Sequence, residues 1–183
     1  MIIGVFGYKG HGKDVVGTAL AGEGFLRESF ARPLKNMLKV GLNLSEEQVN
    51  GSLKEVVDVR YGVTPRRMMQ TLGTEWGRNC VGTSVWLDAL CDRVEARLRL
   101  GEDFVVTDVR FLNEAETIVA RLGGKLLYVN RPSVPADTSH PSEQGVLEIL
   151  SNFNWYSLMN DGSLQDLHRK ALQALTDLRR RHD

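Results

Sequence analysis

The chain has 183 residues, which suits a single domain (residues 1–183) with a sizeable apolar core. Its 23 basic and 23 acidic side chains balance, which argues against a nucleic-acid partner, because nucleic-acid-binding proteins normally carry a basic excess. It has no apolar run near the ~20 residues that span a bilayer, no predicted secretion signal and only two cysteines, so we expect a cytoplasmic protein with reduced thiols and no membrane partner.

The first predicted elements are a strand over residues 2–6 and a helix over residues 14–21, joined by a glycine-rich loop. The junction reads GYKGHGKD (7–14), which fits the phosphate-binding pattern G-x-x-x-x-G-K-[ST] except at Asp14, where a hydroxyl residue is usual. The glycines reach backbone angles that other residues avoid, so successive N–H groups can point into one concavity beside the helix dipole. Lys13 adds a mobile charge for the β- and γ-phosphates. The pattern predicts a nucleotide-polyphosphate site; the alternative is a plain turn with a solvated lysine.

Residues 22–100 carry several helix-start signals. Pro33 suits the first turn of a helix, and Ser45 begins a capping-box sequence. Thr64 and Pro65 place a hydroxyl cap before a proline at the first helical position. The expected elements are a short strand over 25–30, helices from 33 and from 45, and helices over 65–76 and 86–100.

Strands and helices alternate in residues 101–183. Asn113, with Glu116 three residues later, is the expected cap of one helix, and Ser163 is the expected cap of the last. The expected elements are strands over 103–108, 125–130 and 155–159, helices from 113 and from 163, and a loop over 131–145 that contains three prolines and Gly145. This alternation predicts an α/β fold with a mostly parallel sheet covered on both faces, and right-handed crossovers bring the glycine-rich loop to its carboxyl edge.

Two charged residues follow the buried strand predicted at 103–108. Asp108 at the strand end can hold Mg²⁺, directly or through water, or accept a hydrogen bond from the reacting groups; the alternative is an acid that caps the turn. Arg110 could reach a transferring phosphoryl group from the same edge. Pairing with Glu114 across one helical turn is nearly as good an explanation of Arg110.

Charge also gathers where the helix over 65–76 begins. Arg66 and Arg67 lie in its first turn, where cations oppose the helix dipole, and a bound phosphate would explain them. Gln70 lies one turn after Arg66 and could read a base edge. The alternative is a solvated basic face, which we favour for Arg67.

Arg131 begins the predicted loop over 131–145, where a closing lid would start. A lid arginine could stabilise charge between donor and acceptor and help to exclude water; the alternative is an ordinary surface loop, with His140 and Glu143 solvated. The four histidines lack ligand spacing, and no nucleophilic triad emerges. The chemistry that the chain supports is phosphoryl transfer, which needs positioning and charge more than a covalent nucleophile.

Several segments resemble, in order, the bacteriophage-type deoxynucleoside monophosphate kinases. They are GYKGHGKD (7–14), FARPLK (30–35), TPRRMMQTLGTEWGR (64–78), TDVRFLNEAE (107–116), VNRP (129–132), HPSE (140–143) and NDGSLQDL (160–167). The resemblance implies a three-layer P-loop kinase fold with about five strands, an acceptor-binding helical insertion over 31–100 and a lid-like loop over 131–145. It also implies transfer of the γ-phosphoryl group of ATP to a deoxynucleoside 5′-monophosphate with Mg²⁺, in the host cytoplasm if a bacteriophage encodes the protein.

The resemblance assigns roles residue by residue. The donor site would comprise Gly7, Gly10, His11, Gly12, Lys13, Asp14 and Val15, and the metal ligands would be Asp14 and Asp108, directly or through water. The acceptor site would comprise Lys35, Arg66, Gln70 and Arg78. The residues around the transferred group would be Lys13, Asp14, Asp108, Arg110 and Arg131.

One departure from the family pattern concerns the metal. Family members often carry a hydroxyl residue directly after GKD, whereas this chain has Val15, so Asp14 or water must serve the metal instead. A kinase for another phosphorylated acceptor, of the dephospho-coenzyme A or phosphomevalonate type, is the closest alternative. A P-loop ATPase is the other, although such proteins usually carry a glutamate directly after the strand-end acid and here Val109 follows Asp108. The sequence leaves open whether the protein forms a homodimer.

Overall fold

The computed structural model describes residues 1–136 and 141–180, with side chains left undescribed at 141–143. Five parallel strands form one sheet in the order β2-β3-β1-β4-β5. Their bounds are β1 (Ile2–Phe6), β2 (Leu26–Glu28), β3 (Phe104–Val109), β4 (Lys125–Asn130) and β5 (Tyr156–Met159). The first strand is central, so the loop that follows it lies at the middle of the carboxyl edge, and the sequence predicts that edge.

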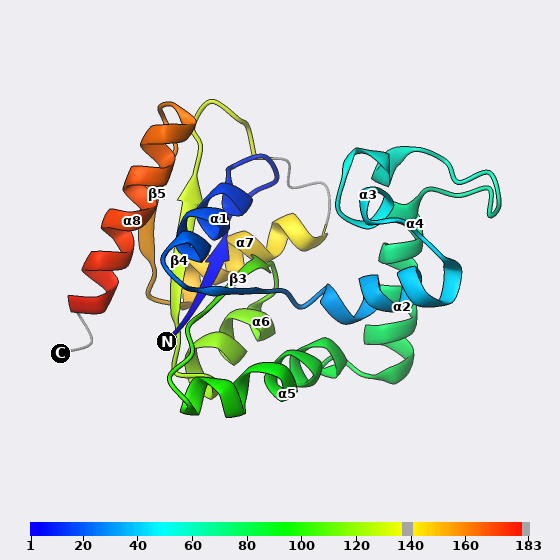
Figure 1. The fold of residues 1–183 in the computed structure, drawn as a ribbon, viewed down its shortest axis with the longest axis horizontal. Helices are drawn as coiled ribbons and strands as arrows, with labels where there is room; N and C mark the ends of the chain where they lie inside the picture. The colour runs from blue at the N-terminus through cyan, green and yellow to red at the C-terminus, as the bar shows by residue number, and fades with distance from the viewer. Residues whose placement is uncertain (137–140, 181–183) are drawn as a thin grey trace. The chain divides into compact units, whose positions relative to one another are not determined.

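Helices cover the two faces of the sheet (Figure 1). On one face α1 (Lys13–Gly22) packs beside α8 (Leu164–Arg180), and together they close an apolar core that includes Val16, Leu20 and Leu167. The other face holds α6 (Leu112–Glu116), its continuation η3 (Thr117–Arg121) and α7 (Pro141–Asn152). The three-layer α/β arrangement expected from the sequence is therefore confirmed.

The chain divides into two compact units, residues 1–29 with 91–183 and residues 30–90. Unit 1 holds the sheet and the helices above. Unit 2 is helical, and its elements are α2 (Arg32–Leu42), α3 (Glu46–Val49), η1 (Ser52–Glu55), α4 (Pro65–Gln70), η2 (Thr71–Val81) and the start of α5 (Val85–Arg99). Its small core joins Leu38, Leu44 and Val49.

In unit 2 the helix that begins at Pro65 continues past its expected end at Trp76 as the π-helical η2. The Thr64 hydroxyl caps it as predicted, accepting from the Arg67 N–H at 3.2 Å. Trp86 packs so closely on Gly77 that a Cβ there would lie 2.4 Å from the indole, and its Nε1 donates to the Gly73 carbonyl at 2.8 Å. Glycines ordinarily weaken a helix, but here Trp86 packs on them and so stabilises the helical conformation of η2.

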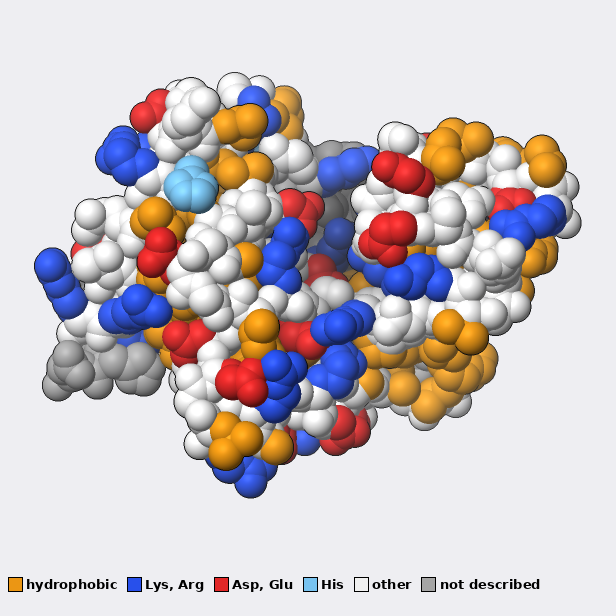
Figure 2. Space-filling model, viewed as in Figure 1, with side chains coloured by type: hydrophobic (Ala, Val, Ile, Leu, Met, Phe, Trp, Pro, Cys, Tyr) orange, Lys and Arg blue, Asp and Glu red, His pale blue; other side chains and the backbone are white. Residues whose placement is uncertain are grey.

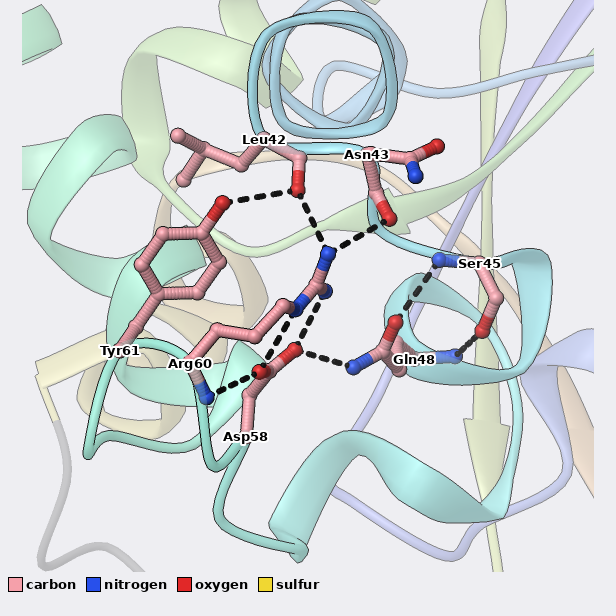
Figure 3. A network of polar contacts seen from close by, with 7 residues as sticks. All are labelled: Leu42, Asn43, Ser45, Gln48, Asp58, Arg60 and Tyr61. Carbon is pink, nitrogen blue, oxygen red and sulfur yellow. Dashed lines mark hydrogen bonds and ion pairs between the residues drawn. The ribbon is translucent and has the colours of Figure 1, made fainter.

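Residues 42–61 of unit 2 are joined by a polar network (Figure 3). The Asp58 carboxylate, almost fully buried, accepts from Arg60 and from the Gln48 amide at 2.7 Å. The Arg60 guanidinium and the Tyr61 hydroxyl donate to the Leu42 carbonyl. Hydrogen bonds from Arg60 hold the pKa of Asp58 well below its ordinary value of 3.8. The network fixes the loop that leads into Thr64 and Arg66.

Two local expectations were wrong. Asn113 does not cap a helix: the helix begins at Leu112, and the buried Glu114 carboxylate accepts from the backbone N–H groups of Arg110 and Phe111 at 2.8 and 3.1 Å. The predicted loop over 131–145 is also too long, because α7 begins at Pro141, a residue that suits a helix start. His140 lies outside the described residues.

The surface matches a chain of balanced charge. Figure 2 shows basic and acidic side chains interspersed over unit 1 and several hydrophobic side chains at the surface of unit 2. In unit 2 the most exposed of these apolar side chains are Val40 and Val59. Among the described residues no helix is long and apolar enough to cross a membrane.

Candidate functional site

The glycine-rich loop follows β1 and ends where α1 begins. Gly7, Gly10 and Gly12 adopt φ angles of 140°, 81° and 103°, which residues with a Cβ rarely reach. A Cβ on Gly7 would also lie 2.4 Å from the Val129 carbonyl oxygen, so the loop rests directly on the end of β4. The backbone conformation is the one that a concave anion site requires, at the N-terminus of a ten-residue helix.

Lys13 is held by its own loop. Its Nζ donates to the carbonyl oxygens of Gly7 at 2.7 Å and Tyr8 at 2.9 Å. These partners are neutral dipoles, so the ammonium keeps its net charge at the mouth of the loop. A polyphosphate oxygen can replace these two carbonyls as acceptors from Lys13.

Asp14 lies in the first turn of α1, where its side chain is 88% exposed. Arg27 of β2 pairs with its carboxylate at 3.1 Å, and the Thr107 hydroxyl lies 3.5 Å from the same oxygen. Neither partner is indicated by the spacing of residues in the sequence. Thr107 thus brings a hydroxyl group beside the residue that replaces the usual hydroxyl of the motif.

A β-bulge in β3 explains why Thr107 and Asp108 both lie at this edge. Gly4 pairs with Val106 and Phe6 with Val109, so two residues of β3 oppose one residue of β1. Bulges re-aim side chains and occur often beside active sites. Because Glu114 holds the backbone N–H of Arg110, the strand end that carries the predicted Asp108 and Arg110 has a defined course.

The residues that follow β4 and β5, Arg131 and Asn160, contact the glycine-rich loop at Gly10 and His11. The His11 ring is only 2% exposed and lies against the backbone of residues 129–134. The Arg131 guanidinium donates to the Gly10 carbonyl at 3.4 Å. The Asn160 amide, another residue that the sequence analysis missed, donates to the His11 carbonyl at 3.0 Å. Arg131 is therefore placed beside the predicted phosphate loop.

A cavity of about 470 Å³ lies beside the start of α1 and of α8. Its volume falls in the range of small-molecule sites. The lining residues are Asp14, Val15, Thr18, Leu164, Gln165 and His168. Val15, which departs from the family pattern, therefore presents apolar surface to this cavity.

The predicted acceptor residues all lie in unit 2. The Lys35 ammonium donates to the Asn50 amide oxygen at 2.7 Å, and Arg66 forms an ion pair with Glu55. Gln70 ends α4, and Arg78 lies in η2. Arg67, which we expected to be solvated, has a 62% exposed side chain and pairs with Glu75 at 3.2 Å.

The oxygen donors near Asp14 are of the kind that Mg²⁺ binds. The carboxylate is exposed and has the Thr107 hydroxyl beside it, and Asp108 follows in the sequence. Within residues 1–136 and 141–180 no group of three or more histidine, cysteine, aspartate or glutamate side chains gathers into a metal site. The residues thus fit a metal that is held mainly by phosphate oxygens and water.

Comparison with known proteins decides the family. A family model described as deoxynucleotide monophosphate kinase matches residues 45–171. A protein of Acanthamoeba polyphaga mimivirus, named as a deoxynucleotide monophosphate kinase, is 35% identical over 170 residues, covering 82% of this chain and 84% of its own. The chain belongs to the deoxynucleotide monophosphate kinase family.

Other similarities agree with membership of the deoxynucleotide monophosphate kinase family. The deoxynucleoside-5′-monophosphate kinase of Escherichia phage T5 is 38% identical over 112 residues, which cover 56% of this chain and 43% of the phage protein. A dephospho-CoA kinase of Campylobacter jejuni superposes with a TM-score of 0.60 at 12% identity, covering 100% of this chain and 98% of the other. The shikimate kinase of Aquifex aeolicus superposes with a TM-score of 0.51 at 13% sequence identity, covering 97% of each chain. These two structures support the P-loop kinase fold.

Proposed function

We propose that the protein transfers the γ-phosphoryl group of ATP to a deoxynucleoside 5′-monophosphate, with Mg²⁺. The observation that carries this proposal is the loop at Gly7–Lys13, with its three left-handed glycines and a lysine held by neutral carbonyls. Family membership supports the choice of acceptor.

In the donor site the loop N–H groups and Lys13 bind the β- and γ-phosphates. The cavity lined by Val15, Thr18 and Leu164 begins at the first turn of the same helix, so it suits the nucleoside end of ATP. Asp14 and Asp108 hold Mg²⁺, directly or through water, with the Thr107 hydroxyl beside Asp14. The metal, when bound, neutralises charge on the phosphates.

In the acceptor site Arg66 binds the 5′-phosphate, and its place in the first turn of the helix that Thr64 caps supports this role. Lys35 and Arg78 supply further positive charge, and Gln70 contacts the base. To bind the acceptor phosphate directly, Lys35 must exchange the Asn50 amide and Arg66 the Glu55 carboxylate for phosphate oxygens.

During transfer an oxygen of the acceptor phosphate attacks the γ-phosphorus, the bond to the bridging oxygen breaks, and ADP leaves as the deoxynucleoside diphosphate forms. Arg131, Arg110 and Lys13 stabilise the charge on the transferred group. Arg131 is supported in this role by its contact with the Gly10 carbonyl.

The test is an ADP-release assay with ATP and Mg²⁺ over a panel of deoxy- and ribonucleoside monophosphates, with dephospho-coenzyme A and a no-acceptor control. We expect ADP release that depends on one or more deoxynucleotides. Equal ADP release without any acceptor would replace the proposal with an ATPase, and activity only with dephospho-coenzyme A would replace the acceptor class.

A further inference from the structure

His11 occupies the position before the last glycine of the phosphate loop, and its side chain is buried against the chain that follows β4. His11 is 2% exposed, and its ring nitrogens lie within hydrogen-bond distance of backbone groups of residues 129–134. Its Nδ1 accepts from the Arg131 backbone N–H at 3.2 Å, and its Nε2 lies 3.2 Å from the Val134 carbonyl oxygen. A buried polar ring between two segments so far apart in sequence is a specific connection between them.

The surroundings select one protonation state of this ring. The Arg131 N–H is a fixed donor, so Nδ1 must be unprotonated to accept from it, and the Val134 carbonyl is a fixed acceptor, so Nε2 must carry the proton. The opposite tautomer would satisfy only the Val129 carbonyl, 3.3 Å from Nδ1. An imidazolium would satisfy both carbonyls but oppose the Arg131 N–H, and it would bury a charge.

Three further hydrogen bonds join the loop and the strand ends at this point. The Arg131 guanidinium donates to the carbonyl of Gly10, the residue before His11, at 3.4 Å. The Asn160 amide donates to the His11 carbonyl, and the Asn160 N–H donates to the Asn130 carbonyl at 2.7 Å. The loop is therefore tied to the end of β4 through both the side chain and the backbone of His11.

We infer that His11 is a positioning residue: its neutral Nε2–H imidazole fixes the backbone of Arg131 and so sets that guanidinium against the phosphate loop. The inference rests on the proposed function, in which Arg131 stabilises the transferred group. A displacement of about 1 Å at such a group can reduce turnover by about 10²-fold, so a contact that touches no substrate can still control kcat.

The sharpest test compares His11→Asn with His11→Gln, which carry the same amide at different distances from the backbone. The Asn Oδ1 takes the place of Nδ1 and can accept from Arg131, whereas the Gln amide reaches the position of Nε2 and can serve only Val134. We expect His11→Asn to keep kcat within about threefold and His11→Gln to lose about tenfold, the effect of one hydrogen bond, with the KM for ATP changed less than kcat in both.

His11→Phe, which fills the volume without hydrogen bonds, should lose at least as much kcat as His11→Gln. The double variant His11→Phe/Arg131→Ala should have nearly the same kcat as Arg131→Ala alone, because His11 acts only through the position of the Arg131 guanidinium. If His11 serves only to fill space, Phe will equal wild type, or Asn and Gln will be equally impaired. Either result would overturn the inference.

Nitrogen-15 NMR of the wild-type histidine rings tests the tautomer without any activity. His11 should show an unprotonated Nδ1 and a protonated Nε2, and the reverse tautomer would contradict the inference. The activity assays separate two failures. If wild-type protein transfers no phosphoryl group to deoxynucleotides, the proposed function fails; if it does so and Asn and Gln behave alike, only the role of His11 fails.

Discussion

The two units hold their proposed phosphate-binding cations in different ways. In unit 1 Lys13 donates to backbone carbonyls at 2.7 and 2.9 Å, within a loop whose shape is fixed by three glycines. In unit 2 Arg66 is paired with the carboxylate of Glu55, and Lys35 with the Asn50 amide. Two loop carbonyls accept from Lys13, whereas Arg66 pairs with a carboxylate.

This difference has a consequence for binding. A phosphate that approaches Lys13 competes with the carbonyls of Gly7 and Tyr8, whereas one that approaches Arg66 competes with the carboxylate of Glu55, which is also an anion. The acceptor site should therefore bind its ligand more weakly than its charge alone suggests. Three substitutions test this contrast, and a fourth tests the polar network of unit 2 that precedes Arg66.

Lys13→Ala should have the largest effect. Removing the ammonium takes away charge that stabilises the transferring phosphoryl group, so kcat should fall by at least about 10²-fold. The thermal midpoint of unfolding should change little, because the lost hydrogen bonds run to a partly exposed loop. Near-normal turnover in a folded Lys13→Ala protein would remove this lysine from the donor site.

Arg66→Ala should act on the acceptor alone. Loss of a charge-assisted phosphate contact costs about 1.5–3 kcal/mol, which corresponds to a rise of about 10- to 150-fold in the KM for the deoxynucleotide. The KM for ATP should stay near its wild-type value. Steady-state kinetics with each substrate varied in turn measures both constants, and equal changes in the two would argue that Arg66 does not bind the acceptor.

Glu55→Gln should have a smaller effect in the opposite direction. It removes the carboxylate that competes for Arg66, so the KM for the deoxynucleotide should fall by about two- to fivefold, the range of one exposed ion pair. Glu75→Gln is the matched control, because it breaks a similar pair with Arg67 and should leave that KM unchanged. A rise in KM on Glu55→Gln would mean that Glu55 orients Arg66 rather than competing for it.

Asp58→Asn should affect catalysis least and be seen mainly as a pH-dependent loss of stability. The pKa of Asp58 is lowered from 3.8 in the folded protein, so its ionised form stabilises the fold above that pH, and the contribution disappears as pH falls through the lowered pKa. We expect the wild-type protein to unfold at a higher midpoint temperature than Asp58→Asn. Measured from pH 7 to pH 2, this difference in midpoint should be constant near neutrality and become smaller below about pH 3.8. A difference in midpoint that does not change with pH would contradict a stabilising role for the ionised Asp58 carboxylate.

Much of unit 1 could be predicted because its signals are local. The loop glycines, Lys13 and the start of α1 are contiguous, and alternating strands and helices leave few topologies. The expectation for residues 131–145 is wrong because proline has two structural roles: it occurs in loops and in the first turn of helices. The closely spaced prolines up to Pro141 predict a loop, whereas Pro141 is the first residue of α7.

The contacts that complete the candidate site could not be predicted from spacing. Thr107 meets Asp14 only because a bulge interrupts β3, and no residue pattern in that strand marks the bulge. His11 and Asn160 meet across 149 positions of the chain, through one amide and one carbonyl. The pairing of Arg66 with Glu55 likewise depends on how η1 packs in unit 2, which the charge pattern of the helix alone does not determine.

The most direct test of the proposed donor site is a crystal structure with a non-hydrolysable ATP analogue and Mg²⁺. We predict that the β- and γ-phosphates lie within hydrogen-bond distance of the N–H groups of residues 10–13. The Lys13 ammonium should have left the Gly7 and Tyr8 carbonyls for the phosphates. An analogue bound elsewhere, with the loop and Lys13 unchanged, would contradict the proposed donor site and the function built on it.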